Sequence, residues 1–549
     1  MNPRDFIKSY WPIPLCMAVS AFFVCFPITD ADLFWHLAAG REMVANRHFL
    51  YADPFSFTLP APRWIDLHWL FQLLCYGLYR AGGLKALLVM KLVAIAATTA
   101  AVCLTHRSKC AVMLSAFLCP VLIFFMRYLL DARPILITLF FMAIYVLLLE
   151  SARRTGKKIS LLLCILLQIL WTNSQGLYMI GLLIIGAYWL ESLIEWRKKK
   201  QDCPVFVTAL FIGCTASCLI NPYGFAGLVL PFDLLSRITP GLRNLYSQTI
   251  SENVPLLSVQ GYETIYRTVT IIVIMVACLL FILNRKKFRL CHLLLFAGFG
   301  WLAFAAERNV PLFFIIAIPI VGSNAADLLQ ADILKKIPAG NRRLVSGEVI
   351  ALGCLVIGAL LVREATIIEH YPPHRVVSPF RFPERITDEL KKNPVPGNLF
   401  NDLRYGGYLI WNLYPAKKVF ADTRLIIRSP QFFAEYLAIS AHPELFDGVA
   451  QKFNITQVIL PSALYTLHLN LIRWLYASRS WRLAYTDGSS VLFLRSDVAG
   501  PSSINLSDSA TVHAIADSVA REWGNAPAVR TEALGYFYAL RDSLAGWRR

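Results

Sequence analysis

The chain has 549 residues, of which 57% are hydrophobic and only 16% are charged. This composition excludes an ordinary soluble protein, in which about a quarter of the residues are charged, and it predicts a multi-span membrane protein. A formal net charge of +18 also occurs in nucleic-acid-binding proteins. Here, however, Lys and Arg cluster in short loops between apolar runs, a pattern that orients membrane proteins. We therefore expect no nucleic-acid partner.

The sequence predicts a polytopic α-helical membrane protein with about eleven transmembrane helices. The first apolar run ends in Thr-Asp-Ala-Asp without a small-residue cleavage site, so we expect it to remain as an anchor. Two short runs, 160–173 and 309–322, also fit half-helices or a re-entrant pair. The complete set of runs is 11–28, 84–104, 111–126, 134–150, 160–173, 176–193, 204–220, 267–284, 289–305, 309–322 and 345–363.

The loops between these runs predict the orientation, because cytoplasmic loops carry an excess of Lys and Arg. Every second loop is basic when the N-terminus is placed in the cytoplasm. The residues that show this are Arg107 and Lys109, the segments 152–158, 195–202 and 284–289, and Lys335, Lys336, Arg342 and Arg343. We therefore expect a multi-pass protein of the inner (cytoplasmic) membrane, with 29–83, 221–266 and everything after about 364 on the extracytoplasmic side.

The last part of the chain differs in composition from the rest. From about residue 380, short β-like runs such as 417–422 and 456–461 alternate with helical stretches. We predict a transmembrane domain over 1–363 that includes the first outer loop 29–83, an extracytoplasmic α/β domain over 364–497, and a linker with a helical tail over 498–549. The paired glycines at 406–407 are interpreted as turn residues. The thirteen Cys are scattered without metal-binding spacing, so we predict neither a disulfide framework nor a zinc site.

Acidic residues follow the first apolar run directly. Asp30 and Asp32 lie where the chain leaves the membrane, and a carboxylate beside hydrocarbon is a functional candidate because its charge is costly there. In a short interfacial helix, Asp32 and His36 would share a face, and Trp35 would anchor the helix at headgroup level. The alternative is that the two carboxylates only cap this helix and end the span.

The same loop holds further polar residues, among them Asp53, Asp66 and His68. Convergent carboxylates and imidazoles suit proton abstraction or divalent-metal binding, and the spacing leaves both roles open. His36 and His68 also fit packed or capping histidines.

Cations and amides occur at other predicted outer span ends. Arg127, Arg133 and Arg308 suit bidentate phosphate binding, although arginines that reach lipid headgroups would occupy the same depth. Asn173 and Gln175 lie in or beside apolar segments. Because unpaired buried amides are expensive, we expect them to line a cavity or to tie helices together.

These features resemble the GT-C superfamily of polyprenol-phosphate-dependent membrane glycosyltransferases. The shared features are an acidic pair after the first span, a large first outer loop, about eleven spans and a C-terminal outer domain. More closely, the chain looks like a group of bacterial GT-C-like membrane proteins, over most of residues 10–497. The segments that carry this likeness are DADLFWHLAAGREMV, DPFSFT, WIDLHWLFQLL, WTNSQG, INPYG, ERNVP, FNDLRYGGYLIWNL and VFADTR.

The resemblance implies an enzyme of the cell envelope that moves a sugar from a polyprenyl-phosphate donor to a glycan, lipid or protein acceptor on the extracytoplasmic side. It implies that Asp30 or Asp32 is a general base or holds a divalent cation, Mg or Mn, and that Asp53 is a second acidic residue of the site. The implied substrate-binding residues are Trp35, His36, His68, Arg127, Arg133, Asn173, Gln175 and Arg308. Related proteins often have His where this chain has Gln175, and Gln does no acid/base work near neutral pH.

Two other functions fit the same sequence. A transporter or flippase of lipid-linked glycans would need charged residues near mid-membrane and broken-helix repeats, whereas this chain places its charges at outer span ends. A catalytically silent scaffold would keep the fold and use its outer domain for partner binding.

Overall fold

The computed structural model describes residues 10–59, 62–157, 159–199, 203–238, 251–261, 264–329, 339–372, 375–424, 427–464, 467–499 and 503–547. The basic N-terminal segment and the expected basic residues Lys335 and Lys336 lie outside this part of the chain. The structure divides into two units. The first comprises 1–26, 67–71 and 82–365, and the second comprises 27–66, 72–81 and 366–549. Most of the first outer loop, which we assigned to the membrane domain, thus groups with the C-terminal region.

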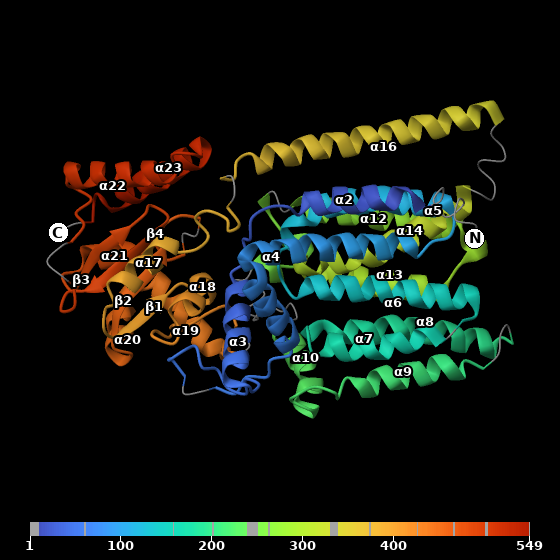
Figure 1. Cartoon of the computed structure of the whole chain (residues 1–549), viewed down its shortest axis with the longest axis horizontal. Coiled ribbons are helices and arrows are strands. Elements are labelled where there is room, and N and C mark those ends of the chain that lie inside the picture. Colours follow the sequence, from blue (N-terminus) through green and yellow to red (C-terminus); the bar gives the residue numbers. More distant parts are fainter. Residues whose placement is uncertain are drawn as a thin grey trace. The chain divides into compact units, whose positions relative to one another are not determined.

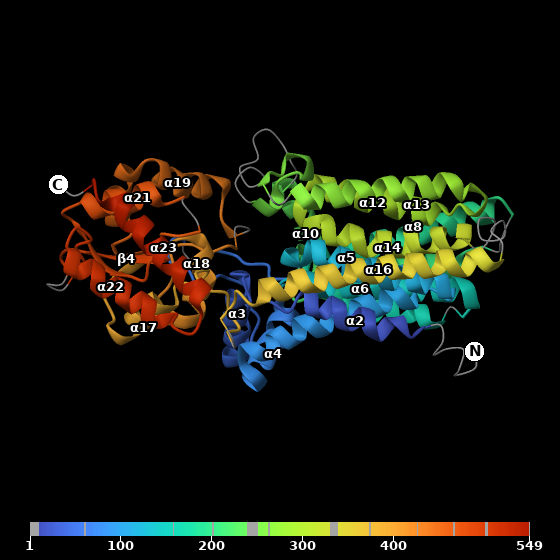
Figure 2. The ribbon, with the colours of Figure 1, turned by 90° about the horizontal axis from the view of Figure 1, so that it is seen from above.

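The first unit is a bundle of apolar helices (Figures 1 and 2). Seven helices in the described residues are long and apolar enough to cross a membrane. They are α4 (Trp69–Leu104), α5 (Lys109–Met126), α6 (Ile135–Thr155), α8 (Met179–Arg197), α12 (Thr264–Leu283), α14 (Val310–Leu328) and α16 (Ala339–Ile368). Four shorter apolar helices are α2 (Pro12–Phe23), α7 (Leu162–Thr172), α9 (Val205–Ser217) and α13 (Leu290–Ala305). Each of the eleven predicted runs overlaps one of these helices, and the chain is an integral membrane protein.

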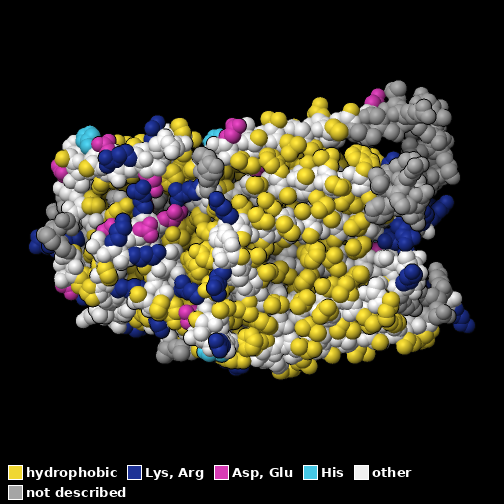
Figure 3. Space-filling model, in the orientation of Figure 1, with side chains coloured by type: hydrophobic (Ala, Val, Ile, Leu, Met, Phe, Trp, Pro, Cys, Tyr) yellow, Lys and Arg dark blue, Asp and Glu magenta, His cyan; other side chains and the backbone are white. Residues whose placement is uncertain are grey.

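The surface of this bundle fits a lipid environment. Figure 3 shows apolar side chains spread over the helices of the first unit. In the interior, α5 packs against α2 and α14, and α13 packs against α8 and α14. The long helix α4 is kinked at Gly82 and Gly83, and Gly83 has a φ of 63°, which suits glycine. The kink coincides with the point where the chain passes from the second unit into the first.

A partly buried ion network joins three helices of the bundle. Arg289, which precedes α13, places Nη1 2.5 Å from Glu150 Oε1 on α6 and Nη2 3.1 Å from Glu191 Oε2 on α8. Arg153 reaches the same Glu191 oxygen at 3.0 Å, and His292 Nε2 lies 3.0 Å from Arg289 Nη1. Arg153 and Arg289, which belong to the expected basic loops, therefore form ion pairs that hold helix ends together.

The second unit contains a four-stranded mixed sheet in the order β1-β2-β4-β3. The strands are β1 (Asn398–Asn401), β2 (Ile455–Pro461), β3 (Trp481–Thr486) and β4 (Ser490–Arg495). The first pair is parallel, and β4 runs antiparallel to both β2 and β3. All seven residues of β2 are buried, as expected for a central strand. The run at 417–422 was expected to be a strand, but Val419 makes only isolated bridges, to Ser56 and Leu399.

The second unit also contains helices. They are α3 (Asp32–Asn46), α17 (Glu384–Lys392), α18 (Leu403–Leu413), α19 (Pro430–Ala441), α20 (Phe446–Lys452), α21 (Leu469–Ala477), α22 (Ser509–Glu522) and α23 (Pro527–Leu544). The last two form the helical tail, whose Val519 and Trp523 share a hydrophobic cluster with Phe380.

The paired glycines at 406–407 were expected in a turn, and that expectation is wrong. Both lie inside α18, where they permit two close backbone approaches. A Cβ on Gly407 would overlap the Ala31 carbonyl oxygen at the start of α3, and one on Gly406 would lie 2.6 Å from the Ala421 carbonyl oxygen. Small residues here bring α18 against α3 and against the segment that follows Val419.

Candidate functional site

The acidic pair lies at the start of α3 in the second unit. Asp30 is buried, with 4% of its surface exposed, and its Oδ1 accepts a hydrogen bond of 2.9 Å from the Asp32 amide. Asp32 is only partly buried. Its Oδ1 accepts hydrogen bonds from Trp35 Nε1, at 3.1 Å, and from the Thr423 hydroxyl. Trp35 is buried, so it does not lie at the surface as the expected membrane anchor would. The indole instead orients a carboxylate.

The loop carboxylate Asp53 forms a buried ion pair with Arg424. Arg424 Nη2 lies 2.9 Å from Asp53 Oδ1 and 2.6 Å from Asp422 Oδ2. The Phe55 amide and the Ser56 hydroxyl also donate to Asp53. Burial alone would raise the pKa of Asp53, but the Arg424 charge and these hydrogen bonds outweigh it and hold the pKa below its ordinary value. Asp53 is therefore a charged, fully engaged group.

Arg424 is surrounded by aromatic rings of the first outer loop. Its guanidinium carbon lies 4.6 Å from the Trp64 ring centroid, 5.1 Å from that of Phe55 and 5.8 Å from that of Trp35. Only 3% of the residue is exposed. Arg424 belongs to the segment VFADTR, and the sequence predicted no role for it. The Asp-x-Arg spacing within Asp422–Arg424 was the one local signal for it, since a bidentate pair can form at that spacing.

His36 contacts a side chain that the sequence analysis did not single out. The His36 Nδ1 lies 3.4 Å from Gln72 Nε2. Gln72 Nε2 also donates a hydrogen bond of 2.7 Å to Asp66 Oδ2. All three residues are buried. Gln72 thus connects two residues of the predicted loop within the second unit.

A second buried polar cluster lies beside the sheet. Asp402 caps the N-terminus of α18 and accepts from the Arg404 amide and guanidinium at 2.8–2.9 Å. His468 Nε2 lies 3.1 Å from Asp402 Oδ2, and its Nδ1 lies 2.7 Å from the Ser440 hydroxyl. Burial would raise the pKa of Asp402, but the hydrogen bonds from Arg404 and His468 lower it overall. Because Ser440, His468 and Asp402 are all buried, this cluster joins α18, α19 and α21 rather than facing a substrate.

The predicted phosphate-binding arginines lie in the first unit. Arg127 donates to the Phe124 carbonyl at 2.6 Å, and its Nε lies 3.0 Å from Glu364 Oε2. Arg133 Nη1 lies 2.6 Å from Glu252 Oε1. Burial alone would raise the pKa of Glu252, but Arg133, and to a smaller extent the charge of Arg308, lower it overall. Arg133 thus pairs with Glu252, and the charge of Arg308 acts on the same carboxylate.

A buried Lys lies in the same unit. Lys91 Nζ lies 3.4 Å from Asp131 Oδ1 and donates to the Phe26 carbonyl at 3.0 Å. Both charged side chains are almost fully buried. The sequence does not predict this pair, because nothing in the local sequence connects residues 40 positions apart.

The amide residues tie helices together. Asn173 donates to the carbonyls of Ile169 and Ile220 at 2.8 and 2.7 Å and accepts from Trp69 Nε1 at 2.8 Å. Gln175 Oε1 lies 2.9 Å from His68 Nε2. Of the two roles considered for these amides, the contacts of Asn173 match the tying of helices.

The predicted site residues thus fall into two sets. Asp30, Asp32, Trp35, His36 and Asp53 belong to the second unit, and His68, Arg127, Arg133, Asn173, Gln175 and Arg308 belong to the first. Across the described ranges, groups of three or more metal-ligating side chains form at two other places, Cys16–Cys103–Cys119 and Glu150–Cys291–His292. Asp30 and Asp32 could therefore hold a cation only as a pair of carboxylates. Mg²⁺ commonly uses one or two carboxylates together with substrate phosphate.

Comparisons with known proteins show which solved structures have a similar architecture. No family model and no curated protein matches the chain. Among solved structures, the archaeal oligosaccharyltransferase AglB from Archaeoglobus fulgidus, in complex with an inhibitory peptide and a dolichol-phosphate, aligns over 91% of this chain and 76% of its own, with a TM-score of 0.57 and 12% identity. The fold is GT-C-like. An Archaeoglobus fulgidus oligosaccharyltransferase in complex with Zn and sulfate aligns over 90% of this chain and 74% of its own, with a TM-score of 0.52 and 10% identity.

A third structure is ArnT from Cupriavidus metallidurans bound to undecaprenyl phosphate. It aligns over 90% of this chain and 99% of its own, with a TM-score of 0.48 and 12% identity. At 10–12% identity the likeness to the oligosaccharyltransferases shows the GT-C-like fold alone, and the chemistry of this chain has to be argued from its own residues.

Proposed function

We propose that this protein is a membrane glycosyltransferase that moves a sugar from a polyprenyl-phosphate donor to an acceptor on the extracytoplasmic side. The observation that carries the proposal is the partly exposed Asp32, at the start of the first outer loop of a GT-C-like fold. Two findings support it. The structural likeness to the oligosaccharyltransferase AglB extends over 91% of this chain, and the AglB structure contains a dolichol-phosphate and an inhibitory peptide.

Asp32 is the best-placed candidate for a general base. Both of its side-chain hydrogen bonds reach Oδ1 and come from neutral donors, Trp35 and Thr423. Within the described ranges it forms no ion pair. Its Oδ2 is therefore available to accept a proton from an acceptor group, in an orientation fixed by the contacts at Oδ1.

Asp53 takes a different role in this proposal. Its two oxygens are engaged by Arg424, Ser56 and the Phe55 amide. It is a positioning residue that keeps Arg424, and with it the segment that carries Thr423, in place. Asp30 accepts from the Asp32 amide and fixes the start of α3. Asp30 and Asp32 together are the candidate ligands for Mg or Mn, which would supply charge neutralisation for a phosphate.

The first unit supplies candidates for the donor phosphate. Arg127, Arg133 and Arg308 are the candidates, because a guanidinium suits bidentate phosphate binding. Arg127 also contacts Glu364, and Arg133 also contacts Glu252. The polyprenyl chain of a donor would be accommodated by apolar helices. His36, His68, Asn173 and Gln175 remain proposed substrate-side residues.

The test is transfer of radiolabelled sugar from polyprenyl-phosphate donors by membranes that contain matched amounts of protein. We expect Asp32→Asn, and the double variant Asp30→Asn/Asp32→Asn, to lose at least 100-fold in transfer rate, as for removal of a general base. Asp388→Asn is the matched control, because Asp388 is an exposed carboxylate of the same unit. Equal transfer by wild type and double variant would contradict the assignment of the base. Movement of lipid-linked substrate across vesicles without chemical change would instead indicate a flippase.

A further inference from the structure

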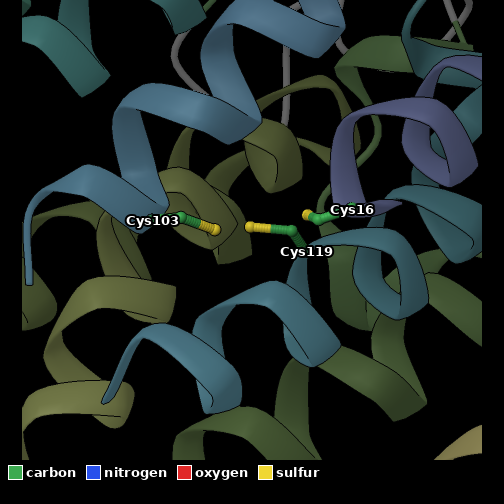
Figure 4. Close-up of side chains that lie close together, drawn as sticks. All are labelled: Cys16, Cys103 and Cys119. Carbon is green, nitrogen blue, oxygen red and sulfur yellow. The ribbon is translucent and has the colours of Figure 1, made fainter. Parts of the chain in front are cut away.

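Three cysteines from three helices of the first unit come together in the bundle interior. Cys16 lies on α2, Cys103 near the end of α4, and Cys119 in the middle of α5. Their exposed fractions are 3%, 0% and 0%, and their sulfur atoms all lie within 4.8 Å of one another. Figure 4 shows the sulfurs of Cys103 and Cys119 facing each other, with the Cys16 sulfur directed into the same space. The sequence hides this cluster, because its members are 87 and 16 positions apart.

We propose that Cys16, Cys103 and Cys119 form a binding site for a soft, thiophilic metal ion of the copper(I) class. Thiolate ligands select soft d¹⁰ cations over Mg²⁺ or Ca²⁺. With metal–sulfur bonds of about 2.3 Å, a trigonal three-sulfur site needs sulfurs about 4.0 Å apart. The observed limit of 4.8 Å means that only small side-chain adjustments separate the cluster from that geometry. This site is unrelated to the proposed glycosyl transfer.

The charge of such a site limits how many of its cysteines ionise. Cysteine binds a metal as the thiolate, so each sulfur that binds the ion releases one proton to solvent. Copper(I) bound by two thiolates has a net charge of −1, and copper(I) bound by three has a net charge of −2. Burial of an uncompensated charge among apolar helices is costly, so the lower charge is favoured. The Ser20 hydroxyl lies beside this cluster, with its Oγ 4.0 Å from the Cys16 sulfur.

The other group of candidate ligands in the described chain shows the contrast. Glu150, Cys291 and His292 also bring their ligand atoms within 4.8 Å of one another. There the Arg289 guanidinium already lies among them, 2.5 Å from Glu150 Oε1, 3.0 Å from His292 Nε2 and 3.1 Å from the Cys291 sulfur. The Arg289 guanidinium thus already supplies a positive charge to that group. The three-cysteine cluster contains only soft ligands.

The experiment uses full-length protein, reduced and purified in detergent without oxygen, and copper(I) as the probe. The background carries Ser at the exposed Cys203, Cys278 and Cys354, so that surface thiols do not bind copper. We expect about one copper(I) per chain after gel filtration, and X-ray absorption that shows only sulfur neighbours at about 2.3 Å. Cys103→Ser/Cys119→Ser should lower the retained copper at least tenfold. The matched control is Cys75→Ser, since Cys75 is fully buried and belongs to neither ligand group.

A second measurement needs no substitution within the cluster. Copper(I) should protect Cys103 and Cys119, but not Cys75, from a membrane-permeable alkylating reagent, as read by mass spectrometry of peptides. If wild-type protein retains no copper, or if the double variant retains as much as wild type, the proposal is wrong and the three cysteines are small packing residues. Equal alkylation with and without copper would overturn it as well.

Discussion

One carboxylate of the second unit, Asp32, is held differently from three carboxylates of the first unit. In the first unit, the buried or partly buried Asp131, Glu191 and Glu364 each contact a Lys or Arg. In the second unit, Asp53 is paired in the same manner, but Asp32 takes its hydrogen bonds from an indole and a hydroxyl. A charge among membrane helices has to be neutralised to be tolerated. A carboxylate oriented by neutral donors keeps its charge for a substrate, which is why the difference points to Asp32.

The largest expected effect comes from breaking the paired arrangement of the second unit. Arg424→Met leaves Asp53 and Asp422 buried without their guanidinium and removes the cation above the Trp64 ring. We expect the free energy of unfolding to fall by about 3–5 kcal/mol, the usual cost of removing one partner from a buried ion pair. Urea unfolding of the purified protein in mixed micelles, followed by tryptophan fluorescence, measures it.

Arg495→Met is the control for that variant. Arg495 pairs with Asp497 at the surface of the same unit, with more than a quarter of its side chain exposed. Because exposed pairs contribute about 0–1 kcal/mol, we expect Arg495→Met to lower the free energy of unfolding only slightly. A similar loss in both variants would mean that burial does not distinguish the two pairs.

Removing the cation from a buried ion pair of the first unit tests whether such pairs also stabilise the membrane region. Lys91→Met leaves the buried Asp131 without its cation and the Phe26 carbonyl without its donor. We expect a loss of about 3 kcal/mol, less than for Arg424, because only one carboxylate is left unpaired and it can take up a proton. The same unfolding assay applies, with Lys287→Met as control since the Lys287–Asp327 pair is exposed. Equal stability of Lys91→Met and wild type would contradict the assignment.

The apolar skeleton of the fold could be predicted from the sequence, and its polar pairing could not. Hydrophobic runs report helices locally, so each of the eleven predicted runs overlaps a helix. The pairs Asp53–Arg424 and Lys91–Asp131 join positions far apart in the chain, and no local pattern fixes which charges meet. For the same reason the three cysteines looked scattered.

Two local errors also have physical causes. The run at 417–422 has β-like composition, but Val419 lies between Ser56 and Leu399, each of which it meets only as a single bridge. The glycines at 406–407 resemble a turn signal, yet tertiary packing places them inside α18, where a close backbone approach requires them. In both cases long-range contacts override local preference.

The close approach at Gly407 holds the helix that carries Asp32 against α18. In Gly407→Ala, the new methyl group would overlap the Ala31 carbonyl oxygen and lie 3.4 Å from the Trp35 side chain. Overpacking of this kind costs about 1–3 kcal/mol, more than the roughly 0.5–1 kcal/mol that Ala gains over Gly inside a helix. We expect a net loss of about 1–2 kcal/mol in the unfolding assay. Gly448→Ala in α20 is the matched control, because its Cβ meets nothing within 4 Å, and it should stabilise slightly.

Acid should weaken the second unit through Asp53. Its folded-state pKa is lowered, mainly by Arg424 acting against burial, so the unfolded chain takes up the proton first as pH falls. The contribution is complete above the unfolded pKa of about 3.9 and declines from there toward the lower folded pKa. We expect the free energy of unfolding to drop below about pH 4 in wild type, and to drop less steeply in Asp53→Asn. Asp402, whose pKa is also lowered, supplies a slope common to both proteins. Identical slopes would contradict the role of Asp53.

The smallest expected effect on stability belongs to Asp32, and it separates the two kinds of carboxylate most clearly. In Asp32→Asn, the amide oxygen can still accept from Trp35 Nε1 and from the Thr423 hydroxyl, because neither donor depends on a negative charge. We expect the free energy of unfolding to change by no more than about 0.5 kcal/mol, whereas Asp53→Asn, which gives up the buried pair with Arg424, should lose several times as much. A large loss in Asp32→Asn would assign the residue to the framework of the fold. If Asp32→Asn keeps its stability but loses sugar transfer, the reaction requires the negative charge of the Asp32 carboxylate.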